Sequence, residues 1–350
     1  MAIAILGSGL MGRIMAIRLF ENGFTDLTLI DKDDIDCSKS PAMIAAGMLA
    51  CLNESVMGGK LIYQLGKDSI KLWRKYLFNL GASHLLNDMG SILIAPTKFN
   101  KEITHHFAKI NFNTDLNVSY PLLNKTDLKN LEPELDFKNA YFLPDEGIVN
   151  AKKVMDTMQE YLRSKINWRF SSEVTFVNSL GHITVKGKKE SFDLIIDCRG
   201  LGSRAIYPQL RGVRGEIIKV YAKEVNITRA VRLFHPRHNI YIVPLQENNY
   251  IIGATEIEAL DYSNVSIRSA LELLTSAYYI HSGFAEARII SLESSCRPTL
   301  IDNLPQIKIE DKLIAINGLY RHGFLLAPSI AEEVLTYLIY GKKCFSQIWN

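Results

Sequence analysis

The feature that most constrains the fold of this chain is the segment 2–31, which combines two apolar runs with a glycine-rich turn. The apolar residues 2–6 predict a buried strand, and residues 13–22 predict an amphipathic helix that ends at a glycine. Residues 27–30 predict a second apolar strand that ends in an acidic residue. A strand, a glycine-rich turn, a helix and a second strand in this order form the βαβ unit that binds dinucleotides.

The turn carries the motif GxGxxG at Gly7, Gly9 and Gly12. Gly7 permits a tight turn, Gly9 allows backbone N–H groups to approach a pyrophosphate, and Gly12 allows the helix to pack closely on the strand. Asp31 follows Gly12 by 19 residues and is placed to accept a hydrogen bond from a ribose hydroxyl. The alternative is a turn that merely starts a helix. The flanking strands and the terminal acid favour a dinucleotide site over that alternative.

The composition of the 350 residues is that of a globular protein and limits the classes of partner. The net charge of +3 is small for this length, so we expect no stable nucleic-acid complex.

The apolar start of the chain resembles a signal peptide but is explained by the dinucleotide motif, and no apolar run predicts a membrane span. Five cysteines without a CxxC pair predict neither a disulfide framework nor a zinc site and fit a reducing cytoplasm. His105 and His106 have no third ligand nearby, so we predict no metal site.

Further along the chain, residues 192–203 repeat the pattern of an apolar strand followed by a glycine turn, which contains Gly200. This repetition predicts that the chain returns to the dinucleotide-binding domain. Residues 216–292 differ, because their strands are joined by short turns and include a predicted hairpin around Asn248. Such a segment predicts a mixed or antiparallel sheet in a second domain that is inserted into the first.

Helical periodicity predicts four longer helices besides the first one, and the earliest of them is expected on the surface. The small residues at 44–50 are compatible with a close helix contact or with backbone that lies against a flat ligand, and composition alone slightly favours the helix contact. The four expected helices cover residues 61–80, 151–162, 266–279 and 325–340.

Several short motifs occur in the order and spacing seen in one enzyme family. Besides the GxGxxG turn they are residues 45–49, Tyr241-Ile242-Val243-Pro244, Ile252-Gly253-Ala254-Thr255, Arg297-Pro298 and residues 320–328. With these motifs the chain resembles, over nearly its whole length, the FAD-dependent amine oxidases of the D-amino acid oxidase superfamily. Within the superfamily it most resembles the glycine oxidases of thiamine biosynthesis. The resemblance implies FAD as the cofactor, a choice that the GxGxxG motif alone leaves open.

Together with the strand pattern, the resemblance predicts an α/β fold in two parts. A Rossmann-like FAD-binding domain is expected to carry an inserted mixed-sheet α+β substrate domain. We expect the FAD-binding domain to be discontinuous and to comprise residues 1–80, 145–215 and 297–350, and the substrate domain to comprise residues 81–144 and 216–296.

The resemblance also implies which residues hold FAD. The GxGxxG turn would bind the pyrophosphate, Asp31 and Lys32 the adenosine ribose, and Val174 would lie near the adenine. The small residues 46–48 and the loop 319–325 would lie against the flavin, and a helix N-terminus there would stabilise negative charge on the ring. The predicted cofactor-binding residues are Gly7, Gly9, Leu10, Met11, Gly12, Asp31, Lys32, Ala46, Gly47, Met48, Val174, Gly200, Leu319, Tyr320, Arg321, His322, Gly323, Phe324 and Leu325.

The candidate substrate-binding residues are Tyr241, Arg297 and Arg321. A carboxylate is planar and two-pronged, so an arginine fork suits it, and a charge-assisted hydrogen bond contributes about 1.5–3 kcal/mol. Arg297 precedes Pro298 as the carboxylate-binding arginine of the family does, and it is the first choice over a surface salt bridge. Arg321 either faces the substrate or holds a neighbouring carboxylate, and Tyr241 either contacts the substrate or is a core aromatic residue with a satisfied hydroxyl. His322 lies in the same loop, and we do not assign it as a base.

The resemblance implies oxidation of glycine, or of a small amine or D-amino acid, to its imine with formation of hydrogen peroxide. The imine would supply thiazole synthesis for thiamine in the cytoplasm. The expected partners are a small amino acid substrate and dioxygen, and the chain is compatible with a homo-oligomer. Two alternatives stay open: an FAD enzyme that acts on a modified tRNA base, against which the small net charge counts, and a non-catalytic dinucleotide-binding redox sensor.

Overall fold

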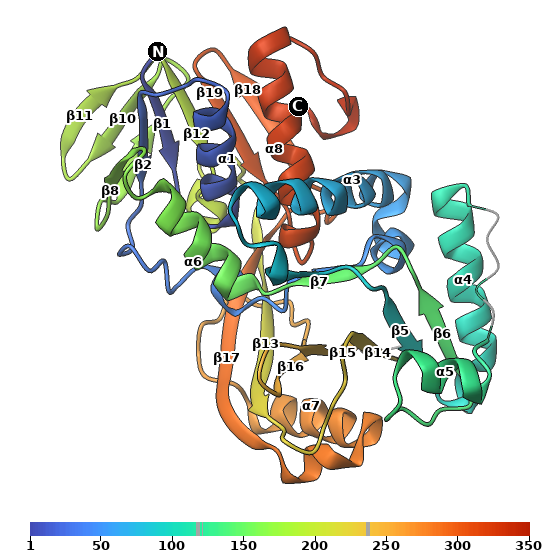
Figure 1. Cartoon of the computed structure of the whole chain (residues 1–350). Helices are drawn as coiled ribbons and strands as arrows, with labels where there is room; N and C mark the ends of the chain where they lie inside the picture. Colours follow the sequence, from blue (N-terminus) through green and yellow to red (C-terminus); the bar gives the residue numbers. More distant parts are fainter. Residues whose placement is uncertain (117–119, 121, 236–238) are drawn as a thin grey trace.

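The structure, a computed structural model, describes residues 1–116, 120, 122–235 and 239–350 and contains two large sheets (Figure 1). The six-stranded sheet lies at the end of the molecule that holds the N-terminus, and the seven-stranded sheet lies at the opposite end (Figure 1). The helices are α1 (Leu10–Glu21), α2 (Pro41–Ile44), α3 (Cys51–Asn79), α4 (Asn100–Thr114), α5 (Lys125–Leu131), α6 (Ala151–Leu162), α7 (Ile267–Ile280) and α8 (Gly323–Tyr340).

The six-stranded sheet has the order β18-β19-β12-β1-β2-β8. Its strands are β1 (Ile3–Leu6), β2 (Leu27–Ile30), β8 (Asn167–Arg169), β12 (Leu194–Asp197), β18 (Gln306–Glu310) and β19 (Leu313–Asn317). Every adjacent pair is parallel except β18 with β19. β12 pairs directly with β1, so the strand predicted within residues 192–198 does return to the dinucleotide-binding unit. The predicted α/β fold is confirmed.

Both faces of this sheet are covered, which explains why its inner strands β1, β2, β12 and β19 are buried along their whole length. In β1, Ile3 and Ile5 belong to the core formed with the helices, whereas Ala4 and Leu6 belong to a second core on the other face. The second face packs against a three-stranded sheet of order β11-β10-β9. Its strands are β9 (Val174–Val177), β10 (His182–Val185) and β11 (Lys188–Ser191).

Helix α1 differs from its prediction in two respects. It begins at Leu10, because the last residues of the GxGxxG motif already form its first turn, and the N–H of Arg13 donates to the carbonyl oxygen of Gly9 at 3.0 Å. It is not amphipathic, since residues 10–19 are all buried. Helices α6 and α8 both contact α1, so it has almost no face toward solvent.

Arg13 is a completely buried side chain that is held by backbone oxygen atoms. Its Nε donates to the carbonyl oxygen of Ser8 at 2.8 Å, its Nη1 to that of Met155 at 2.7 Å and its Nη2 to that of Ile35 at 3.1 Å. These three residues lie in the glycine-rich turn, in α6 and in the loop after β2. Arg13 therefore ties three separate segments to the start of α1.

Helix α3 is longer than predicted. It begins at Cys51 rather than at residue 61, and it is kinked at Gly59, where φ is 66°. Trp73 in its second half is completely buried and donates from Nε1 to the carbonyl oxygen of Phe324 at 2.7 Å. One face of the helix packs against α4 and α8, and the other face is exposed at Lys67, Lys71 and Arg74, so the predicted surface helix is confirmed. The predicted helix 151–162 matches α6, and the helix predicted at 266–279 matches α7 to within one residue at each end.

The small residues at 44–50 do not continue as a helix after Ile44. β3 (Met48–Leu49) pairs with β7 (Gly147–Val149), and β7 pairs in turn with β4 (Leu86–Asn87). Gly47 has φ of 73°, and a Cβ at this position would overlap a backbone carbonyl oxygen of β7. The favoured helix contact is therefore wrong, because the close approach is between two extended segments.

The seven-stranded sheet has the order β17-β13-β16-β15-β14-β5-β6. Its strands are β5 (Ser91–Ile94), β6 (Ala140–Leu143), β13 (Arg211–Tyr221), β14 (Ala230–Phe234), β15 (Asn239–Pro244), β16 (Asn249–Gly253) and β17 (Arg288–Thr299). All adjacent pairs are antiparallel except β14 with β5, which confirms the predicted mixed sheet and the hairpin of β15 and β16. Ile218, Ile242 and Ile252 share a core with Leu273 of α7, so α7 covers one face.

The predicted domain boundaries at residues 215 and 297 fall inside β13 and β17. These two strands pair over most of their length, and Gly215 lies opposite Ser295. The division of the chain at these boundaries remains a prediction.

Among the described residues, α8 is the one helix that is long and apolar enough to cross a membrane. It contacts α1 and α3, and 61% of its apolar window is buried. This burial is that of a core helix.

We predict that Arg13→Met lowers the free energy of unfolding by about 3 kcal/mol or more, because three buried carbonyl oxygen atoms lose a charged donor. Urea denaturation followed by circular dichroism would measure the change. Arg163→Met is the control, since this side chain is 70% exposed and its nearest carboxylate oxygen, on Glu160, is as far away as 3.7 Å. This variant should change the free energy of unfolding by less than about 0.5 kcal/mol. Equal stability of the two variants would contradict a role for Arg13 in holding the three segments.

Candidate active site

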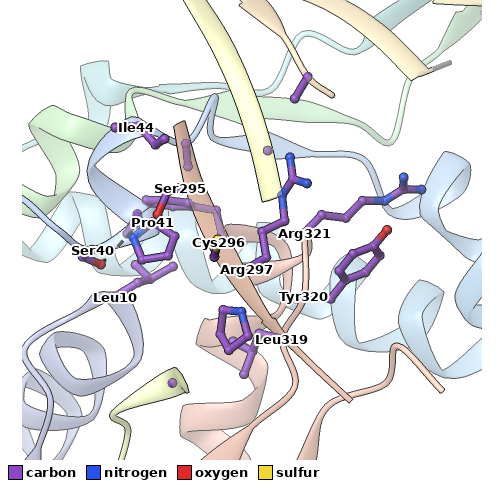
Figure 2. A pocket seen from close by; sticks show the side chains of 18 of the residues that line it. Leu10, Ser40, Pro41, Ile44, Ser295, Cys296, Arg297, Leu319, Tyr320 and Arg321 are labelled. Carbon is purple, nitrogen blue, oxygen red and sulfur yellow. Dashed lines mark hydrogen bonds between the residues drawn. The ribbon is translucent and has the colours of Figure 1, made fainter. Parts of the chain in front are cut away.

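One cavity of about 1350 Å³ extends from the glycine-rich turn to the seven-stranded sheet. Figure 2 shows Leu10 and Ser40 at one side of this cavity and Arg297 and Arg321 at the other. We name these two sides the turn end and the arginine end. Of the predicted site residues only Gly12 is absent from its lining. Those that line it are Gly7, Gly9, Leu10, Met11, Asp31, Lys32, Ala46, Gly47, Met48, Val174, Gly200, Tyr241, Arg297, Leu319, Tyr320, Arg321, His322, Gly323, Phe324 and Leu325.

At the turn end, the carboxylate of Asp31 is fixed by two backbone amides. One oxygen accepts from the N–H of Ser8, and the other accepts from the N–H of Asp33 at 2.9 Å. Each carboxylate oxygen keeps a lone pair for a further donor. Asp31 is thus placed to accept from a ligand hydroxyl, and it also holds the turn through Ser8.

Gly12 supports the turn from behind. A Cβ at this position would overlap the carbonyl oxygen of Gly7, so only glycine lets α1 lie this close to the turn. Gly7 itself has φ of 95°, a conformation that residues with a side chain rarely adopt. The N–H groups of the first turn of α1 have no intrahelical acceptor, and Leu10 and Met11 of that turn line the cavity. This cradle fits a pyrophosphate.

A second helix N-terminus reaches the cavity nearer the arginine end. Gly318 and Tyr320 have φ of 76° and 51°, which reverses the chain before α8 begins at Gly323. The residues 323–325 of its first turn line the cavity, so their free N–H groups favour negative charge on a ligand there. Two helix starts along one cavity fit the pyrophosphate and the flavin ring of the predicted FAD.

Arg297 extends from β17 and has no carboxylate partner within 4 Å in the part of the chain that the structure describes. The side chain makes one hydrogen bond to the described residues, from Nη1 to the carbonyl oxygen of Thr255 at 3.2 Å. The guanidinium lies over Gly215 of the paired strand β13, where any Cβ would overlap it. The glycine therefore makes room for a guanidinium that keeps most of its N–H donors available to a ligand.

Arg321, in contrast, is held by two carboxylates. Its Nε donates to Oε2 of Glu54 at 2.8 Å, and its Nη1 donates to Oε2 of Glu256 at 2.8 Å. Burial would raise the pKa of Glu54, but Arg321, His322 and Arg232 outweigh this effect and lower the pKa to about 2. Glu54 is therefore ionised, and of the two readings of Arg321 the structure favours the one in which it holds neighbouring carboxylates.

His322 and Tyr241 are two further titratable groups at the arginine end. His322 is buried, its Nδ1 lies 3.2 Å from Oε2 of Glu54, and burial lowers its pKa to about 4. Its imidazole is thus neutral at physiological pH. Burial raises the pKa of Tyr241, although Arg297 and other arginines oppose this effect, so the phenol keeps its proton and can donate it.

Sequence reasoning missed Glu54 and Arg232, both of which line the cavity. Glu54 belongs to α3, whose first turns were not predicted to be helical, and no motif marks it. Arg232 occupies one position of an apolar strand, β14, and an unpaired charge in such a strand is a signal that could have drawn attention to it. Among the described residues, no group of His, Cys, Asp or Glu could hold a metal ion, and all five cysteines are free.

Comparison with known proteins decides the family. Residues 2–337 match the family described as FAD dependent oxidoreductase. The chain belongs to this family. It is 32% identical to the putative thiamine biosynthesis oxidoreductase ThiO of Rhizobium etli over 97% of both chains, and 24% identical to the glycine oxidase of Geobacillus kaustophilus over 93% of this chain and 89% of that protein. The crystal structure of the Geobacillus enzyme covers 98% of this chain and 95% of its own with a TM-score of 0.85 at 21% identity, which shows a shared fold.

The cofactor of this oxidoreductase is FAD, and the predicted family, fold class and cofactor are confirmed. The cavity fits FAD, since the turn and the start of α1 form a pyrophosphate cradle and Asp31 offers an acceptor to the ribose. The loop before α8 would meet the isoalloxazine ring. These roles of single residues remain predictions.

We predict that Gly215→Ala weakens binding of a small carboxylate such as glycolate by about tenfold or more, because the new methyl group displaces the Arg297 guanidinium. Titration of the FAD-loaded protein by calorimetry would measure the dissociation constant. Gly212→Ala on the same strand is the control, because its Cβ would press on Leu260 instead of Arg297. A loss of the same size in both variants would mean that damage to β13, and not the position of Arg297, is the cause.

Proposed function

We propose that this protein is an FAD-dependent oxidase of small amino acids, with glycine as the first candidate substrate. The observation that carries the proposal is Arg297, a guanidinium without a carboxylate partner that lines the cavity close to Tyr241 and to the loop before α8. An amino acid carboxylate supplies the partner that the described residues do not. The names of the relatives, glycine oxidase and putative thiamine biosynthesis oxidoreductase, agree with this chemistry.

In the proposed reaction, Arg297 would bind the substrate carboxylate with two parallel hydrogen bonds, and the hydroxyl of Tyr241 would donate a third. This clamp fixes the α-carbon and nitrogen of the substrate, which makes the step effectively unimolecular. FAD, when bound, supplies the redox chemistry by taking up two electrons and passing them to dioxygen. Glycine and dioxygen thus give the imine and hydrogen peroxide.

The described residues around the arginine end offer no ready base. The carboxylate of Glu54 accepts from Nε of Arg321 at 2.8 Å, and burial lowers the pKa of the nearby His322 to about 4, which makes its imidazole a weak base. We therefore propose that the amine reacts in its neutral form, so that its lone pair assists loss of hydride from the α-carbon. The chain contributes orientation and electrostatics.

We predict that Arg297→Lys keeps FAD bound while kcat/KM for glycine falls by about tenfold to a hundredfold, or ~1.4–2.7 kcal/mol of transition-state stabilisation. Lysine keeps the charge but loses the fork, so a carboxylate-free amine should lose much less. Peroxide release in steady state would measure both substrates. Arg288→Lys, an exposed arginine of the same strand, is the control. Equal losses for both substrates would remove Arg297 from the substrate site, and a wild-type protein that binds FAD but oxidises no small amine would refute the proposed function.

We also propose that the imine supplies thiazole synthesis for thiamine in the cytoplasm, as the name of the Rhizobium relative suggests. Deletion of the gene should make aerobic growth dependent on added thiamine or its thiazole. Complementation with the wild-type gene, but not with Arg297→Lys, should restore growth. Full growth of the deletion strain without either supplement, in a background that lacks a second imine source, would contradict the pathway.

A further inference from the structure

Arg232 is a buried guanidinium with almost no hydrogen-bond partners. Only 7% of the residue is exposed, and its Nε has no partner among the described residues. Within the described part of the chain, the side chain makes one hydrogen bond, from Nη2 to the sulfur of Met48 at 3.8 Å. Arginine carries five N–H donors, and buried donors are nearly always satisfied, so a ligand or water must meet them when the site is in use.

The two carboxylates nearest to Arg232 do not fill this need. Oε1 of Glu54 lies 4.0 Å from Nη1, and Oε2 of Glu146 lies 3.9 Å from Nη2. Both oxygens of Glu146 already accept, from the N–H of Asn53 at 3.0 Å and from Oγ of Ser91 at 2.6 Å. Neither acid lies within hydrogen-bond distance of the guanidinium, so both leave its N–H groups free.

The register of the sheet places Arg232 at the arginine end of the cavity. Arg232 of β14 lies directly opposite Tyr241 of β15, so the two side chains point to the same face. Tyr241 in turn lies opposite Gly253, and a Cβ at residue 253 would stand 3.0 Å from the Tyr241 hydroxyl. The tyrosine ring therefore leans over β16 and away from Arg232.

Arg232 and Arg297 consequently flank Tyr241 from opposite sides. The guanidinium of Arg297 lies over Gly215 of β13, which is three strands from β14, or about 14 Å between backbones. Because the side chains of Arg232 and Arg297 are long and both line the cavity, their guanidinium groups lie closer together than the two backbones do. Arg232 also shares Glu54 with Arg321, which places it beside the loop before α8 and far from the nucleotide cradle.

We propose that Arg232 forms a second anion subsite and that the preferred substrates are glycine-type amines with a second carboxylate within a few bonds of the nitrogen. This inference rests on the proposed function and names its substrate class. Arg297 would bind the carboxylate next to the reacting carbon, and Arg232 would bind the second carboxylate on the other side of Tyr241. When free glycine is the substrate, water would hydrogen-bond to the Arg232 guanidinium instead.

Two analogues that lack an oxidisable amine test this subsite. Diglycolate has an ether oxygen in place of the nitrogen and two carboxylates, and ethoxyacetate has the same chain with a methyl group in place of one carboxylate. Calorimetry on the FAD-loaded protein should show that diglycolate binds at least about tenfold more tightly than ethoxyacetate. Arg232→Met should reduce this preference to less than about threefold, and Arg232→Lys should give an intermediate value, because it keeps the charge but loses the fork.

Arg288→Met, an exposed arginine of β17, is the matched control and should retain the full preference. FAD content and circular dichroism would show whether each variant is folded, and the wild-type comparison of the two analogues needs no variant. Equal affinity of the wild-type protein for diglycolate and ethoxyacetate would overturn the subsite, as would a preference that survives Arg232→Met.

Glycine turnover, measured in parallel as peroxide release, separates this inference from the proposed function. Turnover of glycine without a diglycolate preference would reject the subsite and leave the oxidase proposal intact. A diglycolate preference in a protein that oxidises no amine would support the subsite and reject the oxidase proposal.

Discussion

The ion pairs of Arg321 with Glu54 and Glu256 control what the arginine end of the cavity can bind. They occupy one guanidinium with two carboxylates at 2.8 Å, so this cation is compensated within the protein. Glu54 belongs to α3 and Arg321 to the loop before α8, and the same pair therefore also fixes the distance between two elements that line the cavity. Among the described residues, Arg297 and Arg232 are the cations at this end that keep free donors. The site thus separates a cation that supports the structure from two that are available to a ligand.

Glycines, which have no side chain, shape the site as much as the larger residues do. Gly215 leaves the space that the Arg297 guanidinium fills, and Gly253 leaves the space over which the Tyr241 ring leans. Both glycines lie on strands whose other residues mostly carry large side chains, so each opens one local gap. Gly12 acts in the same way at the turn end, where it lets α1 approach the carbonyl oxygen of Gly7. A polar group can then be buried at a defined place without loosening the sheet around it.

The parts of this structure that follow from local periodicity could be predicted from the sequence, and the parts that depend on tertiary packing could not. The βαβ unit, α6 and the hairpin of β15 and β16 carry strong local patterns. Their ends were predicted to within two residues, except for the start of α1. The burial of α1 escaped prediction, because it depends on α6 and α8 from distant parts of the chain. The glycine-rich turn, Tyr241, Arg297 and Arg321 were found by motif, and all of these predicted site residues except Gly12 of the turn do line one cavity. Glu54 was missed since its role arises only when α3 meets the loop before α8.

The titratable groups around the arginine end are held in fixed protonation states near neutral pH. Glu54 is ionised because its basic neighbours, Arg321 first among them, outweigh the effect of burial and hold its pKa near 2, and His322 is neutral because burial holds its pKa near 4. Burial raises the pKa of Tyr241, so its hydroxyl remains a donor. If the proposed function holds, none of these three groups changes charge between the acidic limit set by His322 and the alkaline limit set by Tyr241. The ammonium group of the substrate is then the group that titrates, and kcat/KM would rise with pH as the substrate amine becomes neutral.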